Sequence, residues 1–268
     1  MKFLFTGFLS IIFYSACAQK PLWEQLWQIQ TKGKTLNTDN LGNAYITDND
    51  MLTKYRENGV FYRVYSNKKL GRISFADVGN PLKIVLFYQD FSRIIFLDNT
   101  LTENGNPLQL EDRELELASL VCTSFDNGLW IYDPIRFQLI RFNQQLQETV
   151  KITNVNQILG YAPDPVFMTE QESVLYMNDP ARGILRFDIF GTYLSMISLK
   201  GLKDFQVQDN TIFFSSEKGK LMAYGLKNFQ TDTISLPRKD YDYLSWWKDR
   251  VYILAQDSLS VYRYLPAK

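Results

Sequence analysis

The sequence predicts an all-β fold, a six-bladed β-propeller, and three observations lead to this prediction. Aromatic residues make up 15% of the 268 residues, which favours strands over helices. Turn-forming pairs such as Asn-Gly and Asp-Pro interrupt the chain at short intervals. A unit containing two short strands recurs about every 40 residues, a period typical of propeller blades with four strands each.

The repeated unit is clearest at residues 122–143. A turn at residues 126–128 precedes an apolar strand at residues 129–132. A second turn, at Asp133-Pro134, precedes another strand that ends on Phe142. This layout predicts two antiparallel strands with turns on both sides. Near the start of the periodic region, residues 44–47 and 51–56 are expected to form the same pair of strands.

The second strand of each unit ends on an aromatic or apolar anchor. The anchors lie 37 to 45 residues apart and are Tyr55, Leu97, Phe142, Phe187, Tyr224 and Tyr262. Six anchors predict six blades, which bury their apolar faces by stacking in a ring. The innermost strands are expected within residues 72–77, 120–125, 165–170, 203–208 and 243–247. We expect residues 27–35 to close the ring as the outer strand of the last blade, whose inner strands lie within residues 243–265.

Residues 1–18 have the features of an export signal. Lys2 is followed by an apolar run at residues 3–14 that is too short to span a bilayer. Residues 15–17 resemble the end of a bacterial lipobox, which predicts a lipid anchor on Cys17, although Tyr14 stands where a lipobox usually has Leu. The alternative is an Ala-x-Ala site at residues 16–18, cut before Gln19. In both cases residues 19–268 are exported, and they are expected to form one propeller domain.

Composition excludes several classes of function. Lys plus Arg and Asp plus Glu both number 29, so no basic surface for nucleic acid is expected. The chain has no histidine, which removes the usual general base and the commonest zinc ligand. Cys122 is the only cysteine besides Cys17 and is expected to be a small core residue. We therefore expect no enzyme activity and no cofactor.

Two segments resemble known propeller repeats. Residues 183–191, GILRFDIFG, are similar to the hydrophobic-x-x-Phe-Asp-x-x-Gly run of NHL-type repeats, and residues 126–131, DNGLWI, resemble the repeat of sensor-type propellers. At the level of blades the resemblance covers most of residues 38–265, and it implies a fold and not an activity. The signal ending in Cys17-Ala18-Gln19, followed by an aromatic-rich propeller, is similar in style to envelope lipoproteins of Bacteroidota.

Carboxylates are frequent in the predicted turns. They include Asp48, Asp50, Asp126, Asp133, Asp164, Asp179 and Asp188. Several of them at the axis could hold a divalent cation, and resemblance to the gluconolactonase-like six-bladed hydrolases would imply such a cluster. Their pattern does not map onto this chain. Capping of turns by Asp side chains explains most of these residues, so no metal site is expected.

The most aromatic stretch is residues 241–247, which contain Tyr241, Tyr243, Trp246 and Trp247. Neighbouring side chains of a strand point to opposite faces, so the two tryptophans cannot share one blade interface. One of them could be exposed to a sugar ring or a protein partner; the alternative is that both are buried between adjacent blades. Trp23 could likewise dock on a partner or belong to the closing strand.

The functional prediction is a non-catalytic interaction or scaffold module of the bacterial cell envelope. We expect a subunit of a membrane-associated complex, attached through Cys17 to the outer membrane and bound to envelope or outer-membrane proteins. A soluble periplasmic protein is the alternative location. Two other functions remain open: a metal-dependent lactonase-type hydrolase, and a carbohydrate-binding propeller that uses Tyr243 and Trp247 for a glycan or small molecule.

Overall fold

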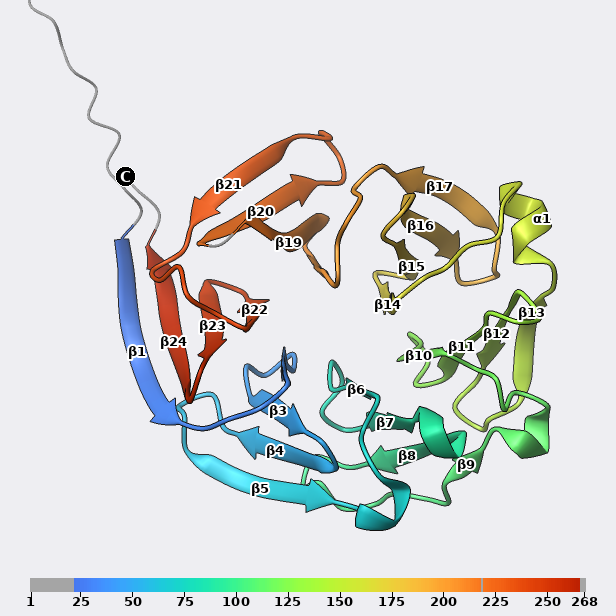
Figure 1. Cartoon of the computed structure of the whole chain (residues 1–268), viewed down its shortest axis with the longest axis horizontal. Coiled ribbons are helices and arrows are strands. Elements are labelled where there is room, and N and C mark those ends of the chain that lie inside the picture. The colour runs from blue at the N-terminus through green and yellow to red at the C-terminus, as the bar shows by residue number, and fades with distance from the viewer. Residues whose placement is uncertain (1–21, 218, 266–268) are drawn as a thin grey trace, which may run out of the picture.

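The computed structural model describes residues 22–217 and 219–265, which form a ring of six four-stranded antiparallel sheets (Figure 1). Each sheet is one blade, and its strands run in order from the axis to the rim. The predicted all-β, six-bladed propeller is confirmed. The export signal at residues 1–18 and the anchor residue Cys17 lie outside the described residues.

The first three blades follow the chain without a break. Blade 1 contains β2 (Thr35–Thr38), β3 (Ala44–Asp48), β4 (Met51–Tyr55) and β5 (Phe61–Ser66). Blade 2 contains β6 (Phe75–Asp77), β7 (Ile84–Tyr88), β8 (Arg93–Leu97) and β9 (Leu108–Gln109). Blade 3 contains β10 (Leu120–Thr123), β11 (Leu129–Asp133), β12 (Gln138–Phe142) and β13 (Glu148–Ile152).

The other three blades complete the ring. Blade 4 contains β14 (Phe167–Gln171), β15 (Val174–Asp179), β16 (Gly183–Asp188) and β17 (Tyr193–Ile197). Blade 5 contains β18 (Gln206–Gln208), β19 (Thr211–Glu217), β20 (Lys220–Gly225) and β21 (Thr231–Ser235). Blade 6 contains β22 (Tyr243–Trp247), β23 (Arg250–Ala255), β24 (Ser258–Leu265) and β1 (Leu22–Gln30).

Helical structure is confined to short connections between strands. The helix α1 (Val155–Leu159) follows blade 3, and three 3-10 helices cover Lys68–Leu70, Gln89–Phe91 and Glu111–Arg113. None of the helices among the described residues has the length and apolar character needed to cross a membrane.

Most of the buried residues lie on the second and third strands, because each blade is covered by two neighbours. All five residues of β7 and of β11 are buried. The predicted anchors lie on the third strands, where Tyr55 pairs with Ala44 and Phe142 pairs with Leu129. The apolar side chains meet in six clusters, one between each pair of adjacent blades. Burial on both faces explains the continuous apolar runs from which the repeat was recognised.

The ring is closed by β1, which pairs antiparallel with β24 on the rim of blade 6 (Figure 1). Closure by an N-terminal strand in the last blade is therefore confirmed. The predicted limits of that strand, residues 27–35, are wrong, because the strand covers Leu22–Gln30. Residues 31–34 instead connect it to the first strand of blade 1.

An extra residue in β1 directs its two tryptophans to different blades. Gln25 pairs with Tyr262 and Trp27 with Val261, so Leu26 interrupts the register. Such a bulge reverses the alternation of side chains. The Trp23 indole N–H donates to the carbonyl oxygen of Ser235 in blade 5 (2.8 Å), whereas the Trp27 indole N–H donates to the carbonyl oxygen of Glu57 in blade 1 (2.8 Å).

Candidate functional site

One face of the ring is formed by the turns that join first to second strands and third to fourth strands. We call it the pocket face, and its turns in blades 1 to 3 are residues 39–43, 56–60, 78–83, 98–107, 124–128 and 143–147. The turns of neighbouring blades meet on it: the Asn40 N–H donates to the carbonyl oxygen of Gly79 (3.3 Å), and the Asn80 side chain donates to that of Asn127 (2.7 Å).

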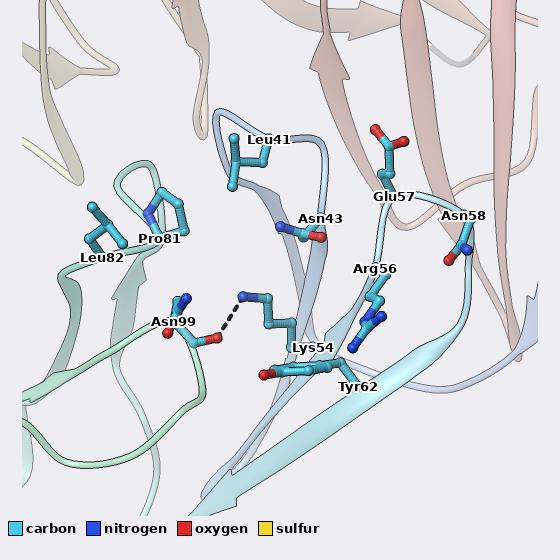
Figure 2. Close-up of a pocket in the computed structure, with 10 residues that line it drawn as sticks. All are labelled: Leu41, Asn43, Lys54, Arg56, Glu57, Asn58, Tyr62, Pro81, Leu82 and Asn99. Atoms are coloured by element: carbon cyan, nitrogen blue, oxygen red, sulfur yellow. Dashed lines mark hydrogen bonds between the residues drawn. The ribbon is translucent and has the colours of Figure 1, made fainter.

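A pocket of about 310 Å³ opens on this face between blades 1 and 2 (Figure 2). Its volume is at the lower end of the range for ligand sites. Apolar side chains of Leu41, Pro81 and Leu82 line one part. The remaining lining residues are polar, charged or aromatic: Asn43, Lys54, Arg56, Glu57, Asn58, Tyr62 and Asn99.

Two cations of β4 and its following turn face this pocket. Lys54 is 5% exposed, and its ammonium group donates to the carbonyl oxygen of Asn99 (2.8 Å). Burial lowers the pKa of Lys54 below its usual range. The Arg56 guanidinium lies 4.9 Å from the centre of the Tyr62 ring. Among residues 22–217 and 219–265, no carboxylate forms an ion pair with either cation.

Strand geometry explains why these three side chains converge. Lys54 is two residues after the buried core residue Leu52, so both face blade 2. Lys54 pairs with Arg63 and Tyr55 with Phe61, which leaves Tyr62 as the extra residue of a bulge. The bulge directs the Tyr62 ring towards the cations. Lys54, Arg56 and Tyr62 were not predicted as site residues, and the only sequence signal is a lysine that continues the apolar face of a strand.

Two exposed apolar residues line the pocket, and a third lies in the first turn of blade 3. Leu41 is 60% exposed and Leu82 is 70% exposed, each in the first turn of its blade. Phe125 occupies the corresponding turn of blade 3 and is 56% exposed. Exposed apolar residues that gather beside a cavity are typical of binding surfaces.

The axis of the ring contains aromatic side chains. Phe75 of blade 2 and Phe167 of blade 4 lie 6.1 Å apart between ring centres, although their blades are not neighbours. Phe205, directly before blade 5, lies 5.2 Å from Phe167. These rings meet across the axis, where the hydrolase hypothesis would place a cation.

Two acids on innermost strands, Asp77 of β6 and Glu170 of β14, connect adjacent blades. The Asp77 carboxylate accepts hydrogen bonds from the backbone N–H and hydroxyl of Thr123 (2.8 and 2.7 Å). Glu170 accepts from the Ser124 hydroxyl (2.8 Å), the Phe125 N–H (2.9 Å) and the Trp130 indole (2.6 Å). In the described part of the chain, no group of three or more acidic or cysteine side chains could hold a metal ion.

Several of the turn carboxylates cap turns, as the sequence indicated. Asp133 accepts from the N–H groups of Ile135 and Arg136, and Asp188 accepts from those of Phe190 and Thr192. Asp179 caps its turn in the same way through the N–H of Ala181. Their hydrogen-bonding capacity is therefore used within the fold.

The two adjacent tryptophans of β22 point to opposite blade interfaces. Trp246 is 7% exposed and stacks on Phe213 of blade 5, with ring centres 5.3 Å apart. Trp247 packs against the cluster between blades 6 and 1, and its ring lies 4.4 Å from the Lys248 ammonium. The face of each ring is therefore occupied by another side chain of the protein.

The remaining aromatic candidates also contact other blades or strands. Tyr243 is half-buried and packs against the same cluster as Trp247. The Tyr241 hydroxyl forms a hydrogen bond with the Ser215 hydroxyl. Trp23 is half-buried beside Trp246 and Tyr264. A role of these residues in binding a partner or a glycan stays a prediction.

Cys122 is completely buried between blades 3 and 4. Burial raises the pKa of its thiol well above the usual value. A thiol that is buried and protonated is unreactive, so Cys122 serves the core as predicted.

No protein-family model matches the chain, and no curated protein sequence matches it significantly. The resemblance to NHL-type repeats therefore stays a prediction. Solved structures of low sequence identity have a similar fold, and at such identity the similarity shows the fold alone.

Three of these structures illustrate the range. Virginiamycin B lyase of Staphylococcus aureus is 14% identical, with a TM-score of 0.56 over 85% of this chain and 79% of the lyase. BBS1N, in complex with ARL6DN, is 11% identical, with a TM-score of 0.58 over 93% and 99%. PorZ of Porphyromonas gingivalis, a bacterial surface component of the type-IX secretion system, is 10% identical, with a TM-score of 0.54 over 91% of this chain and 39% of PorZ. The same fold therefore occurs in an enzyme, in a propeller solved in complex with another protein, and in a component of a secretion system.

Proposed function

We propose that the protein is a non-catalytic interaction module of the bacterial cell envelope, anchored through Cys17 and bound to a membrane-associated complex. The observation that carries this proposal is the pocket face. Its turns in blades 1 to 3 present exposed apolar side chains beside a pocket, on a ring whose blades are tied together by hydrogen bonds. A rigid surface with exposed apolar anchors is suited to binding a protein partner.

Two of the similar structures support this proposal. BBS1N was solved in complex with a protein, ARL6DN, which is consistent with a propeller that binds a protein partner. PorZ is a bacterial surface component of a secretion system, which is consistent with an exported propeller in the envelope. The export signal in residues 1–18 supports the same location.

The test is an affinity pull-down of the tagged full chain from gently solubilised native membranes. The unaltered chain, Leu82→Lys and the matched control Ile135→Lys are compared. Leu82 lies on the pocket face, whereas Ile135 is 67% exposed in the turn between β11 and β12 on the opposite face. We expect a stoichiometric envelope protein that is lost only with Leu82→Lys.

A Cys17→Ala chain tests the anchor separately. We expect it to leave the membrane fraction while it retains the partner. Recovery of the unaltered chain without any stoichiometric protein would contradict the interaction module. Membrane association that is unchanged in Cys17→Ala would contradict the lipid anchor.

The alternative of a metal-dependent hydrolase has less support, because aromatic rings meet at the axis and the carboxylates of Asp77 and Glu170 accept hydrogen bonds from the neighbouring blade. We expect the thermal midpoint of unfolding to be unchanged by millimolar calcium. A calcium-dependent rise would indicate a cation site and favour the hydrolase.

A further inference from the structure

Blades 1 and 3 can be compared residue by residue, because their first turns have the same length. Thr38 pairs with Ala44 in blade 1, and Thr123 pairs with Leu129 in blade 3, so five residues form each turn. On the next strands, Tyr45 pairs with Lys54 and Trp130 pairs with Arg141.

Two equivalences follow from this register. The cation Arg141 of blade 3 stands where Lys54 stands in blade 1. Asp126 and Leu41 both lie three residues before the second strand of their blade. The blades therefore share a buried cation but differ in the residue of the turn above it.

In blade 3 the cation is neutralised within the blade. Arg141 is 7% exposed, and its guanidinium forms an ion pair with the Asp126 carboxylate at 2.6 Å. It also donates to the Ser124 hydroxyl (2.8 Å) and lies 4.6 Å from the centre of the Phe125 ring. One carboxylate from the first turn thus completes the surroundings of the buried cation.

In blade 1 that carboxylate is replaced by Leu41, and the pocket lies beside it. Two acids, Asp39 and Asp98, act electrostatically on Lys54 without forming an ion pair, and both accept hydrogen bonds from other groups. Asp39 accepts hydrogen bonds from the N–H groups of Leu41 and Asn43, and also from the Asn43 side chain and the Tyr45 hydroxyl. Asp98 caps the turn at residues 99–102. Among the residues that the structure describes, Lys54 therefore has two carboxylates at longer range but none in an ion pair, although a buried lysine is usually paired.

The donors available in the pocket suit one carboxylate. An ammonium group has three N–H donors, of which the Asn99 carbonyl uses one, and Figure 2 shows the Lys54 nitrogen pointing into the space below Leu41 and Pro81. Arg56 offers a second positive charge on the same side. Glu57 also lines the pocket, and its negative charge would oppose a ligand carrying two negative charges.

We propose that this pocket binds the carboxylate of an apolar ligand, held by Lys54 and Arg56 at the place that Asp126 fills in blade 3. Leu41, Pro81 and Leu82 contact the apolar part. The ligand is either a free monocarboxylic acid or a carboxylate-bearing segment of a protein partner. The inference concerns the pocket alone and is independent of the anchor at Cys17.

The test is titration calorimetry on the full chain with three probes. Hexanoate represents a free acid, N-acetyl-Leu-Leu a peptide with a carboxylate, and N-acetyl-Leu-Leu-amide the same peptide without the charge. We expect the amide to bind about tenfold more weakly than the acid peptide, or worse, because the charge-assisted hydrogen bonds are lost. Binding of both acids indicates a free acid as ligand, whereas binding of the acid peptide alone indicates a protein segment.

The decisive variant is Leu41→Asp, which places a carboxylate in blade 1 at the position of Asp126. Leu41 is exposed, so the substitution spares the core. We expect this variant to lose at least about tenfold in affinity for the carboxylate probes and to unfold at a higher temperature, while Leu41→Asn retains binding. Lys54→Met should also lose binding.

Arg63→Gln is the matched control for loss of a cation. Arg63 is exposed, and its guanidinium donates to the Thr100 carbonyl (3.1 Å) outside the pocket. The Arg63→Gln variant should bind the carboxylate probes with the same affinity as the unaltered chain. The proposal is overturned if no carboxylate probe binds, if the amide binds equally well, or if Leu41→Asp leaves the affinity unchanged.

Discussion

Removal of the Trp23 side chain tests whether β1 closes the ring or presents a docking surface. In the structure, the Trp23 ring lies 5.0 Å from the centre of the Tyr264 ring and 6.3 Å from that of Trp246. Its indole N–H donates to the Ser235 carbonyl of blade 5. Truncation to alanine would remove the packing and the hydrogen bond between blades 5 and 6 together.

The expected cost can be estimated from these contacts. Truncation of a buried tryptophan to alanine costs about 3 to 5 kcal/mol, and because Trp23 is half-buried we take about 3 kcal/mol. For a protein of this size each kcal/mol corresponds to about 2–4 °C, so Trp23→Ala should lower the thermal midpoint by about 6–12 °C. Trp23→Phe retains a ring but loses the hydrogen bond, at about 1 kcal/mol.

The assay is urea and thermal unfolding of the full chain followed by circular dichroism. Gln28→Ala is the matched control, since Gln28 is exposed on the same strand, and surface substitutions usually stay within about 0.5 kcal/mol. If Trp23→Ala is no more destabilising than Gln28→Ala, the reasoning about closure is refuted. If Trp23→Ala fails to capture the partner while its stability is unchanged, Trp23 belongs to a docking surface instead.

Three further predictions concern the core and its titration. Glu170→Ala leaves the fully buried Trp130 indole without its hydrogen-bond acceptor, and should lower the free energy of unfolding in urea by about 3 kcal/mol. The control is Glu148→Ala, at an exposed residue, which should cost less than about 0.5 kcal/mol. Equal effects of the two substitutions would contradict a stabilising hydrogen bond between the blades. Gly128→Ala would place a Cβ 1.9 Å from the Phe142 carbonyl oxygen, so its thermal midpoint should fall further than that of Gly105→Ala, which meets no atom within 4 Å and bears only the strain of its positive φ. Burial, with a hydrogen bond to Glu103, raises the pKa of Tyr65 to about 12. The folded state then keeps a proton that the unfolded state loses near pH 10, so this stabilisation is complete below pH 10 and is lost between about pH 10 and 12, at about 1.4 kcal/mol per pKa unit. If the urea midpoint of Tyr65→Phe falls with pH as much as that of the unaltered chain, the assignment of this pH dependence to Tyr65 is contradicted.

The blade count could be predicted because burial on two faces makes most of the second and third strands rich in apolar residues. That pattern recurs at each anchor, so Tyr55, Phe142 and Phe187 aligned without knowledge of the pairing. The limits of β1 could not be predicted in the same way. Trp23 and Trp27 have a spacing that fits a turn of helix or one face of a strand, and the bulge at Leu26 that separates them leaves no mark in the sequence.

The pocket was missed for a physical reason. A lysine in a strand usually indicates a solvent-exposed position, and only the packing of blade 1 against blade 2 shows that Lys54 is buried. Its equivalence with Arg141 depends on strand register and on two turns of equal length. The adjacent Trp246 and Trp247 were correctly separated by strand alternation, because no bulge interrupts β22.

Closure by β1 also determines where mechanical load would enter the molecule. Leu22, the first residue of β1, pairs with Leu265 at the end of β24, on the rim of blade 6 (Figure 1). Four residues separate Cys17 from Leu22, so five steps along the chain give a tether of at most about 18 Å. If Cys17 carries the proposed lipid, a pull from the membrane would peel β1 from its Leu22 end, and the Trp23 indole would be the first side chain to resist. Detachment from the membrane and opening of the ring would then compete along the same strand.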